Sequence, residues 1–450
     1  MGIIKNRAEI LSYGQIDLRR DALDIIEAGI EGGDPGRGTR ARVHRSDDYL
    51  VVGDQKYNLN EIAHIYVVGA GKGSFPIGEA LEEVLGPLLT GGAIVVKRGE
   101  KRRLKGIEII EAGHPIPDRA SVGGGKRILE IASTAGEGDI VFAAITGGAS
   151  ALATVPPEGI SLEEIQELND LLLRSGAVIR DMNIVRRHLC RIKGGRLAAS
   201  IQPAEALTLT LDTSPEGMPW PDMCLPDPST FGDAIDMLRH YDLWDLASPS
   251  IRSFLIEGMN RPELETIKSF SGIKARMVSV GDPVSMCTAA AACARDLGYG
   301  ETILATNLEG EAREAGVCMA GITKEIIKHR RPFKPPCALI SGGETTVTIR
   351  GESGQGGPNQ EFVLGFVQNA SDTGEFVCVS LDSDGTDGPT EIAGGIIDNL
   401  TLEEARRRNV DLAGALKNHR SSEALTRLGG AIITGHTGTN LQNLRVILIR

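Results

Sequence analysis

The sequence predicts a protein of the α/β class, with two or three domains and largely parallel sheets. Its 450 residues exceed the size of one ordinary domain. Apolar runs of strand length alternate with stretches of helical period nearly from end to end, a pattern typical of βαβ units. A content of 41% apolar and 24% charged residues indicates a globular chain rather than a disordered one.

Short apolar runs give the expected strands, because a strand buried in a parallel sheet reads as a nearly continuous apolar segment. In chain order these runs are residues 62–68, 93–96, 140–145, 206–211, 276–280, 302–305, 338–341, 376–381, 431–434 and 445–449.

Helical periodicity gives the expected helices between these strands. In chain order they are residues 18–28, 77–85, 161–178, 289–297, 311–327, 360–367 and 402–408. Two of them start with a capping-box pattern, Ser161 with Glu164 and Thr401 with Glu404. The polar, proline-containing segments 212–228 and 248–272 are the expected connections between domains, and we place the boundary near residue 260.

The charge balance and the termini restrict the partners and the compartment. With 48 basic and 60 acidic residues, the net charge of −12 argues against a nucleic-acid binder. The first residues lack the apolar core of a signal peptide, and the longest uncharged run, 140–157, contains glycines and a proline pair that do not suit a membrane span. Seven scattered cysteines without a CxxC pair fit reduced thiols. We therefore expect a cytoplasmic protein without a membrane partner.

Glycine turns after the expected strands are the first candidate binding sites. In an open parallel sheet, ligands bind beyond the carboxyl ends of the strands, where glycines let the backbone approach an anion. In the segment 69–74, GAGKGS, Ser74 stands where a dinucleotide fingerprint would have glycine, and the spacing of the glycines and the lysine is not that of a Walker loop. For this segment, a tight turn with an exposed lysine is the alternative to an anion-binding turn. The residues selected are Gly71, Lys72, Gly147, Gly148, Ser150, Gly342, Gly343, Glu344 and Thr345.

Charged residues supply further candidates. Asp382, Asp384 and Asp387 crowd together after one strand, and we favour Mg²⁺ binding or proton acceptance there over a hydrogen-bonded turn. The basic segment 183–196 contains Arg187 and Lys193, which could hold an anionic substrate or lie on a solvated helix face. The loop histidines at positions 114 and 436 are interpreted as structural.

Ten motifs occur in a familiar order between residues 18 and 449. They are GAGKGS, GHPIPD, ITGGASAL, NIVRRHLCRIKGGRLA, LPDPSTFGDA, NLEGEARE, SGGETTVTIRG, GGPNQE, DSDGTDGPTEIAGG and TGTNLQNLRV. Together they resemble the glycerate 2-kinases of the MOFRL-containing type, of which some members are labelled hydroxypyruvate reductases.

This resemblance implies a Rossmann-like N-terminal domain over residues 1–260. It also implies a C-terminal α/β domain over residues 261–450 that includes a MOFRL region at about 336–448, with the active site in the cleft between the domains. The implied activity is transfer of the γ-phosphoryl group of ATP, with Mg²⁺, to the 2-hydroxyl of D-glycerate. The partners are then this small substrate and ATP, and a homodimer is possible. The alternatives are an NADPH-dependent hydroxypyruvate reductase and a non-catalytic protein that binds a nucleotide or a sugar acid.

The resemblance also assigns roles to residues. Many relatives carry arginine where this chain has Pro358, so Arg186, Arg187 or Lys193 would have to supply the missing cation. The implied catalytic residues are Lys72, Asp384, Asp387 and Arg187. The implied metal ligands are Asp384, Asp387 and Asp212. The implied nucleotide-binding residues are Gly71, Gly147, Gly148, Ser150, Lys193, Gly342, Gly343, Glu344, Thr345 and Asn359.

Overall fold

The computed structural model describes residues 2–100, 102–213, 222–349, 353–370 and 374–450. The chain divides into two compact units. Unit 1 consists of Met1–Asp34 together with Gly281–Arg450, and unit 2 is the continuous segment Pro35–Val280. The division after Val280 differs from the boundary expected near residue 260. The proposed connection 248–272 lies inside unit 2. Of the other, 212–228, residues 214–221 lie outside the described residues, and the described ones belong to unit 2 as well.

Unit 2 is built on a parallel sheet with the strand order β6-β5-β4-β7-β8-β9. The pairings from β6 through β8 are all parallel, so the predicted parallel α/β arrangement is confirmed for this unit. A small antiparallel sheet, β1-β2-β3, accompanies it. The strands are β1 (Val43–Ser46), β2 (Tyr49–Val52), β3 (Gln55–Asn58), β4 (Ile65–Ala70), β5 (Leu89–Lys97), β6 (Glu108–Ala112), β7 (Ile140–Ile145), β8 (Glu205–Leu211) and β9 (Ala275–Gly281).

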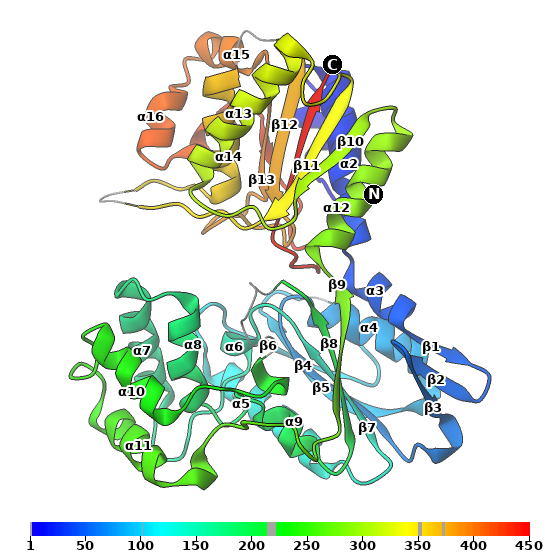
Figure 1. Ribbon diagram of the computed structural model, residues 1–450, viewed down its shortest axis with the longest axis vertical. Coiled ribbons are helices and arrows are strands. Elements are labelled where there is room, and N and C mark those ends of the chain that lie inside the picture. Colours follow the sequence, from blue (N-terminus) through cyan, green and yellow to red (C-terminus); the bar gives the residue numbers. More distant parts are fainter. Residues whose placement is uncertain (1, 101, 214–221, 350–352, 371–373) are drawn as a thin grey trace. The chain divides into compact units, whose positions relative to one another are not determined.

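The helices of unit 2 complete two apolar cores. One core includes residues of strands β4, β5 and β7 and of helices α5, α6 and α9. The other is formed among α7, α8, α10 and α11 (Figure 1). The helices are α3 (Pro35–Arg42), α4 (Ser74–Leu85), α5 (Arg119–Thr134), α6 (Ala149–Leu152), α7 (Leu162–Arg174), α8 (Ile179–His188), α9 (Arg196–Ile201), α10 (Phe231–His240) and α11 (Pro249–Asn260).

The start of α7 confirms one capping prediction. Glu164 N donates to Ser161 Oγ (3.1 Å), and Ser161 N donates to Glu164 Oε2 (2.8 Å). The helix ends at Arg174 rather than continuing to residue 178, because Gly176 adopts a left-handed φ of +76°. Val178 then caps the separate helix α8.

Unit 1 contains a six-stranded sheet with the order β10-β11-β15-β12-β13-β14. Its strands are β10 (Gly300–Ala305), β11 (Cys337–Gly343), β12 (Phe376–Asp382), β13 (Gly394–Asp398), β14 (Ala431–Ile432) and β15 (Asn443–Ile449). Only the β10–β11 pairing is parallel, so the expectation of a largely parallel sheet is wrong here. β12 reaches β13 through a loop without a helical crossover, and β15 runs opposite to both of its neighbours, which makes their pairings antiparallel.

Helices cover both faces of this sheet, with α2 and α12 on one face and α13 and α14 on the other (Figure 1). The first residues of the chain belong to unit 1 because α2 packs on α12 and on β15. The helices are α1 (Arg7–Ile10), α2 (Ile16–Gly32), α12 (Pro283–Asp296), α13 (Ala312–His329), α14 (Pro358–Ala370), α15 (Thr401–Arg407), α16 (Leu412–Lys417) and α17 (Ser421–Leu428).

The second capping prediction is wrong. Thr401 is the first residue of α15 rather than its cap, and its hydroxyl donates to Asp398 Oδ1 (3.2 Å). Glu404 does not reach back to the helix start, because it pairs with Arg407 (2.6 Å) and with Arg408.

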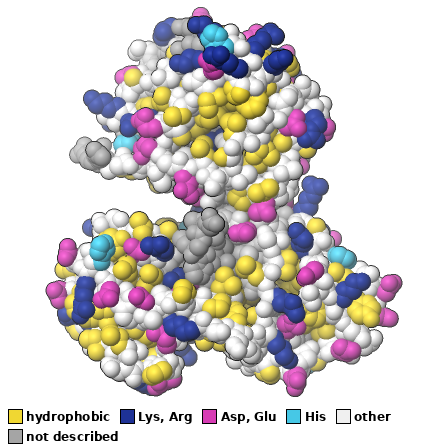
Figure 2. Space-filling view, viewed as in Figure 1, with side chains coloured by type: hydrophobic (Ala, Val, Ile, Leu, Met, Phe, Trp, Pro, Cys, Tyr) yellow, Lys and Arg dark blue, Asp and Glu magenta, His cyan; other side chains and the backbone are white. Residues whose placement is uncertain are grey.

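Charged side chains of both signs are interspersed on the face shown in Figure 2. Over the residues that the structure describes, no helix has the length and apolar content needed to cross a bilayer.

Candidate functional site

The carboxyl edge of the parallel sheet in unit 2 brings the first two glycine turns together. β4 and β7 are neighbouring parallel strands, so the turns that follow them lie side by side. Lys72 N donates to Gly147 O (2.9 Å), and Gly73 N donates to Thr146 Oγ1 (2.9 Å). The structure thus joins the two turns that carry the predicted residues Gly71, Lys72, Gly147, Gly148 and Ser150.

Two of these glycines are required by the backbone and by close packing. Gly71 has a φ of +140°, and a Cβ there would lie 2.1 Å from Thr146 Oγ1. Gly148 has a φ of +88°, and its Cβ would lie 3.0 Å from His114 Nε2 and 3.5 Å from Lys72 Cγ. The side chains of His114 and Lys72 therefore approach the same turn. The sequence did not predict this proximity, because only the fold brings the loop of His114 to Gly148.

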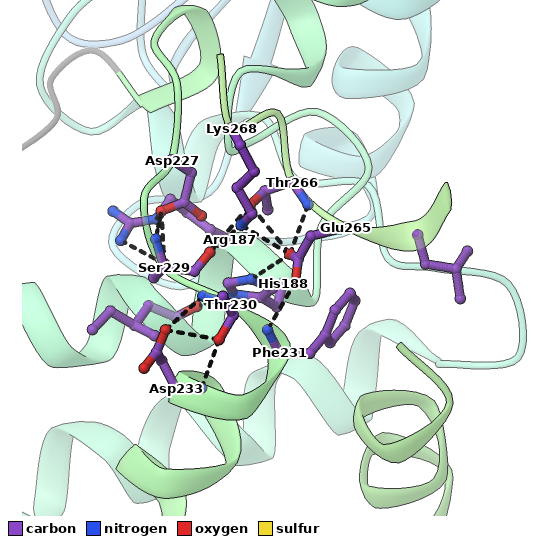
Figure 3. Close-up of polar contacts among 12 residues, drawn as sticks. Arg187, His188, Asp227, Ser229, Thr230, Phe231, Asp233, Glu265, Thr266 and Lys268 are labelled. Carbon is purple, nitrogen blue, oxygen red and sulfur yellow. Dashed lines mark hydrogen bonds and ion pairs between the residues drawn. The ribbon is translucent and has the colours of Figure 1, made fainter. Parts of the chain in front are cut away.

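The basic segment is mostly buried rather than solvated. Arg187 at the end of α8 has its Nε 3.1 Å from Asp227 Oδ1, and Arg187 Nη2 donates to Ser229 Oγ (3.2 Å). Ser229 Oγ donates in turn to Asp227 Oδ1 (2.6 Å). Figure 3 shows these three side chains pointing toward one another. Both members of the ion pair are buried, so Arg187 fixes the segment that carries Asp227.

His188, the next residue, ties a further segment to α8. Its Nε2 lies 2.9 Å from Glu265 Oε1, and Phe231 N donates to Glu265 Oε2 (3.2 Å), as Figure 3 shows. Burial lowers the pKa of His188. These contacts hold the start of α10 and the segment around Glu265 against α8.

Lys193 and Asp222 are buried near this network. Burial lowers the pKa of Lys193 and raises the pKa of Asp222, while the opposite charge of each partner acts against the shift. Asp212, the third predicted metal ligand, is exposed just after β8 in unit 2, whereas Asp384 and Asp387 belong to unit 1.

In unit 1, the Asp387 carboxylate caps α14. Its Oδ1 accepts hydrogen bonds from Asn359 N and Asn359 Nδ2, and its Oδ2 accepts from Gln360 N and Gln360 Nε2, all at 3.0 Å. Burial raises the pKa of Asp387 to about 6, against the effect of these four donors. Both oxygens are thus committed to the start of the helix, a geometry that does not suit a metal ligand or a general base.

Asp382, the last residue of β12, and Asp384, in the loop that follows, form a pair of carboxylates near Asp387 in the sequence. Asp384 Oδ1 accepts from Thr386 N (2.8 Å) and from Thr386 Oγ1 (2.7 Å), and Asp382 Oδ1 accepts from Asp384 N (3.0 Å). Burial, and then the charges of Asp384 and Glu344, raise the pKa of Asp382 well above its ordinary value. The loop is therefore a hydrogen-bonded turn that also concentrates negative charge.

This concentrated charge fits a divalent cation only in part. Among the described residues, no group of three or more His, Cys, Asp or Glu side chains could hold a metal. Mg²⁺ usually takes one or two carboxylates and completes its shell with water and phosphate oxygens. Asp382 and Asp384 meet that smaller requirement, whereas Asp387 does not.

Two of the other predicted residues in unit 1 take part in buried hydrogen bonds. Asn359 Nδ2 also donates to Asn443 Oδ1 (2.7 Å), and Thr345 Oγ1 accepts from Arg445 Nη2 (2.8 Å). Burial lowers the pKa of Arg445 to about 10. Arg445 is not among the residues selected from the sequence, although an arginine inside the apolar run of β15 indicates a buried charge.

The glycines after β11 pack against protein. Gly343 has a φ of +111°, and a Cβ there would lie 2.0 Å from Leu308 N. Gly342 O accepts a hydrogen bond from Leu308 N (2.9 Å). Pro358 is the first residue of α14, where the missing N–H leaves no helical hydrogen bond unmade.

Comparisons with known proteins agree with this architecture. Two family models match: "Domain of unknown function (DUF4147)" over residues 21–256 and "MOFRL family" over residues 337–443. A glycerate 2-kinase from Pyrococcus horikoshii is 39% identical, with 96% of this chain and 98% of that protein covered. A D-glycerate 2-kinase from Thermotoga maritima is 36% identical, again with 96% and 98% covered. A protein of Agrobacterium vitis, named as a candidate hydroxypyruvate reductase, is 35% identical over 85% of this chain and 86% of its own length.

Two solved structures are similar over nearly the full chain. The crystal structure of glycerate kinase from Thermotoga maritima has a TM-score of 0.83 at 34% identity, covering 96% of this chain and 100% of that one. The crystal structure of the PH0495 protein from Pyrococcus horikoshii has a TM-score of 0.81 at 39% identity, covering 97% and 99%. The ten ordered motifs, the two-unit α/β fold and these full-length similarities agree, and the chain belongs to the glycerate kinase family that combines the DUF4147 and MOFRL regions.

Proposed function

We propose that this protein is a glycerate 2-kinase. It transfers the γ-phosphoryl group of ATP to the 2-hydroxyl of D-glycerate and produces 2-phosphoglycerate and ADP. The observation that carries the proposal is the similarity, over 96% of the chain, to two proteins named as glycerate 2-kinases. In the reaction, the 2-hydroxyl oxygen forms a bond to the γ-phosphorus, the bond from that phosphorus to the bridging oxygen breaks, and the hydroxyl proton is released.

Unit 2 supplies charge and a backbone cradle at the carboxyl edge of its sheet. Phosphoryl transfer depends mainly on positioning and on neutralising charge. Lys72 stands between the turns at Gly71 and Gly147, where a point charge can hold the glycerate carboxylate or stabilise the transferred group. Gly148 and Ser150 extend this cradle.

Unit 1 supplies the carboxylates for the metal. Asp384, together with Asp382, would hold Mg²⁺ beside the nucleotide phosphates, and the turn from Gly342 to Thr345 lies at the end of β11 in the same unit. Bound Mg²⁺ would neutralise negative charge on the phosphates.

Asp387 and Arg187 act through other groups in this proposal. Asp387 holds the start of α14, which carries Asn359, and Arg187 holds the segment of Asp227. Lys193 remains a proposed anion-binding residue. We further propose a cytoplasmic location and a homodimer for this chain.

A reductase is the second candidate, because the Agrobacterium vitis relatives carry that name. The turn after β4 weakens it, since Ser74 occupies the position of a fingerprint glycine. A non-catalytic binding protein is the third.

One set of incubations separates these candidates. The chain is mixed with D-glycerate, ATP and Mg²⁺, and the phosphoglycerate isomer is identified by NMR. In a separate vessel, NADPH absorbance is followed with hydroxypyruvate. We expect 2-phosphoglycerate and no NADPH consumption. Formation of 3-phosphoglycerate would contradict the position of transfer, oxidation of NADPH would favour the reductase, and binding without turnover would favour the third candidate.

A further inference from the structure

The loop that follows β6 crosses the carboxyl edge of the parallel sheet in unit 2. β6 and β7 are separated by β5 and β4, so at about 4.8 Å per strand spacing they lie roughly 14 Å apart. His114 is only two residues beyond the end of β6. Its Nε2 nevertheless lies 3.0 Å from the position that a Cβ on Gly148, just after β7, would occupy. The loop therefore carries the imidazole over the ends of β5 and β4.

The far end of this loop is anchored. Asp118 caps α5 by accepting from Ser121 N (3.0 Å), and Arg98 Nη2 donates to Asp118 Oδ2 (2.6 Å). Gln166 Nε2, from α7, donates to Pro117 O (2.6 Å). The half-buried imidazole is thus presented by a fixed loop, as a preorganised contact requires.

His114 and Lys72 both approach Gly148. A Cβ at Gly148 would also lie 3.5 Å from Lys72 Cγ, so the two side chains flank a residue that has no side chain of its own. An ammonium group suits a carboxylate, and an imidazole can donate to or accept from a hydroxyl. A small 2-hydroxy acid carries both groups on adjacent carbons.

We propose that His114 contacts the acceptor substrate beside Lys72, with its Nε2 edge hydrogen-bonded to the substrate hydroxyl. This inference rests on the proposed function, because it takes the acceptor to be a 2-hydroxy acid such as glycerate. His114 then orients the hydroxyl, while Lys72 holds the negative charge.

The kinetic test uses His114→Gln, which keeps a polar group of similar reach. The matched control is His64→Gln, since His64 lies just before the opposite end of β4 and pairs with Asp139 (3.0 Å). We expect the KM for D-glycerate to rise and its kcat/KM to fall about 10- to 100-fold in His114→Gln, with the KM for ATP unchanged. His64→Gln should retain the wild-type values. Thermal unfolding of each variant reports whether the fold is intact.

A binding test does not require turnover. With ¹⁵N-labelled histidine, the imidazole signal absent from His114→Gln assigns His114, and D-glycerate is titrated without nucleotide. We expect the His114 signal to shift and the His64 signal to stay. Wild-type kinetics in His114→Gln together with an unshifted signal would overturn the inference. A shifted signal from a protein that phosphorylates no glycerate would instead refute the proposed function and leave the binding site standing.

Discussion

The Asp387 carboxylate gives the sharpest test of whether a predicted catalytic residue is structural. Asp387→Ala removes one acceptor group and leaves four donors of Asn359 and Gln360 without it. Both backbone donors belong to the first turn of α14, and the site is buried, so water does not replace the carboxylate freely. At roughly 1 kcal/mol for each stranded donor, we expect unit 1 to lose about 4 kcal/mol of stability.

The distribution of tryptophan lets this loss be assigned to one unit. Both tryptophans, at positions 220 and 244, fall within the segment that forms unit 2. In Asp387→Ala, the urea midpoint followed by far-UV circular dichroism, which reports all helices, should therefore be lower than in the wild type. The midpoint followed by tryptophan fluorescence should fall less. For Asp387→Asn, which keeps one acceptor oxygen, the midpoint by circular dichroism should lie between those of Asp387→Ala and the wild type.

The opposite outcome would refute the reasoning. If Asp387→Ala unfolds like the wild-type chain by both signals and yet loses phosphotransfer, the carboxylate is not needed by α14. It would then have to act on a ligand, as the sequence alone suggested.

Three further predictions concern unit 2. Lys72→Ala should lower turnover about 10²-fold or more while unfolding is unchanged, with Lys56→Ala, at an exposed position of β3, as the control; wild-type kinetics would remove Lys72 from the site. Arg187→Ala leaves Asp227 buried without its cation and should cost roughly 3–5 kcal/mol in urea unfolding followed by fluorescence; a smaller loss than 1 kcal/mol would mean that the pair is not stabilising. Hydrogen bonds, first from a serine hydroxyl of α11, lower the pKa of Glu164 to about 2, below its ordinary 4.5. The stabilisation of the folded state by ionised Glu164 is present above pH 4.5 and is lost as the pH falls toward 2. In Glu164→Gln, the free energy of unfolding should therefore fall less between pH 4.5 and 2 than in the wild type, and an equal fall would contradict this prediction.

Much of the secondary structure could be predicted because burial leaves a signature in the sequence. Each of the ten predicted strands overlaps an observed strand, and 140–145 matches β7 at both ends. β1 and β3 were missed because they are short and largely polar. β2 and β13 were also missed although most of their residues are buried, because their apolar runs are only two or three residues long. β6 was missed because glutamates interrupt its apolar run. The direction of β15 could not be predicted, since strand order depends on contacts that local periodicity does not encode.

Part of the candidate site could be predicted in the same way. The glycine turns were found because they follow apolar strands, and positive φ angles at Gly71, Gly148 and Gly343 are typical of such turns. The uses of Asp387 and Arg187 were not predictable, because their partners lie tens of residues away in sequence. The local sequence of an acidic or basic cluster does not show whether its side chains will bind a ligand or will pair with a helix start or a carboxylate from a distant part of the chain.

The discontinuity of unit 1 has a consequence for how the chain is made. Synthesis releases α1 and α2 before unit 2, which is continuous and can fold while residues 281–450 are still being made. The sheet of unit 1 must wait for β15, which lies between β11 and β12 and is made of residues 443–449. Loss of residues 443–449 would open the middle of that sheet, between β11 and β12, and would leave an unpaired edge on each of these two strands.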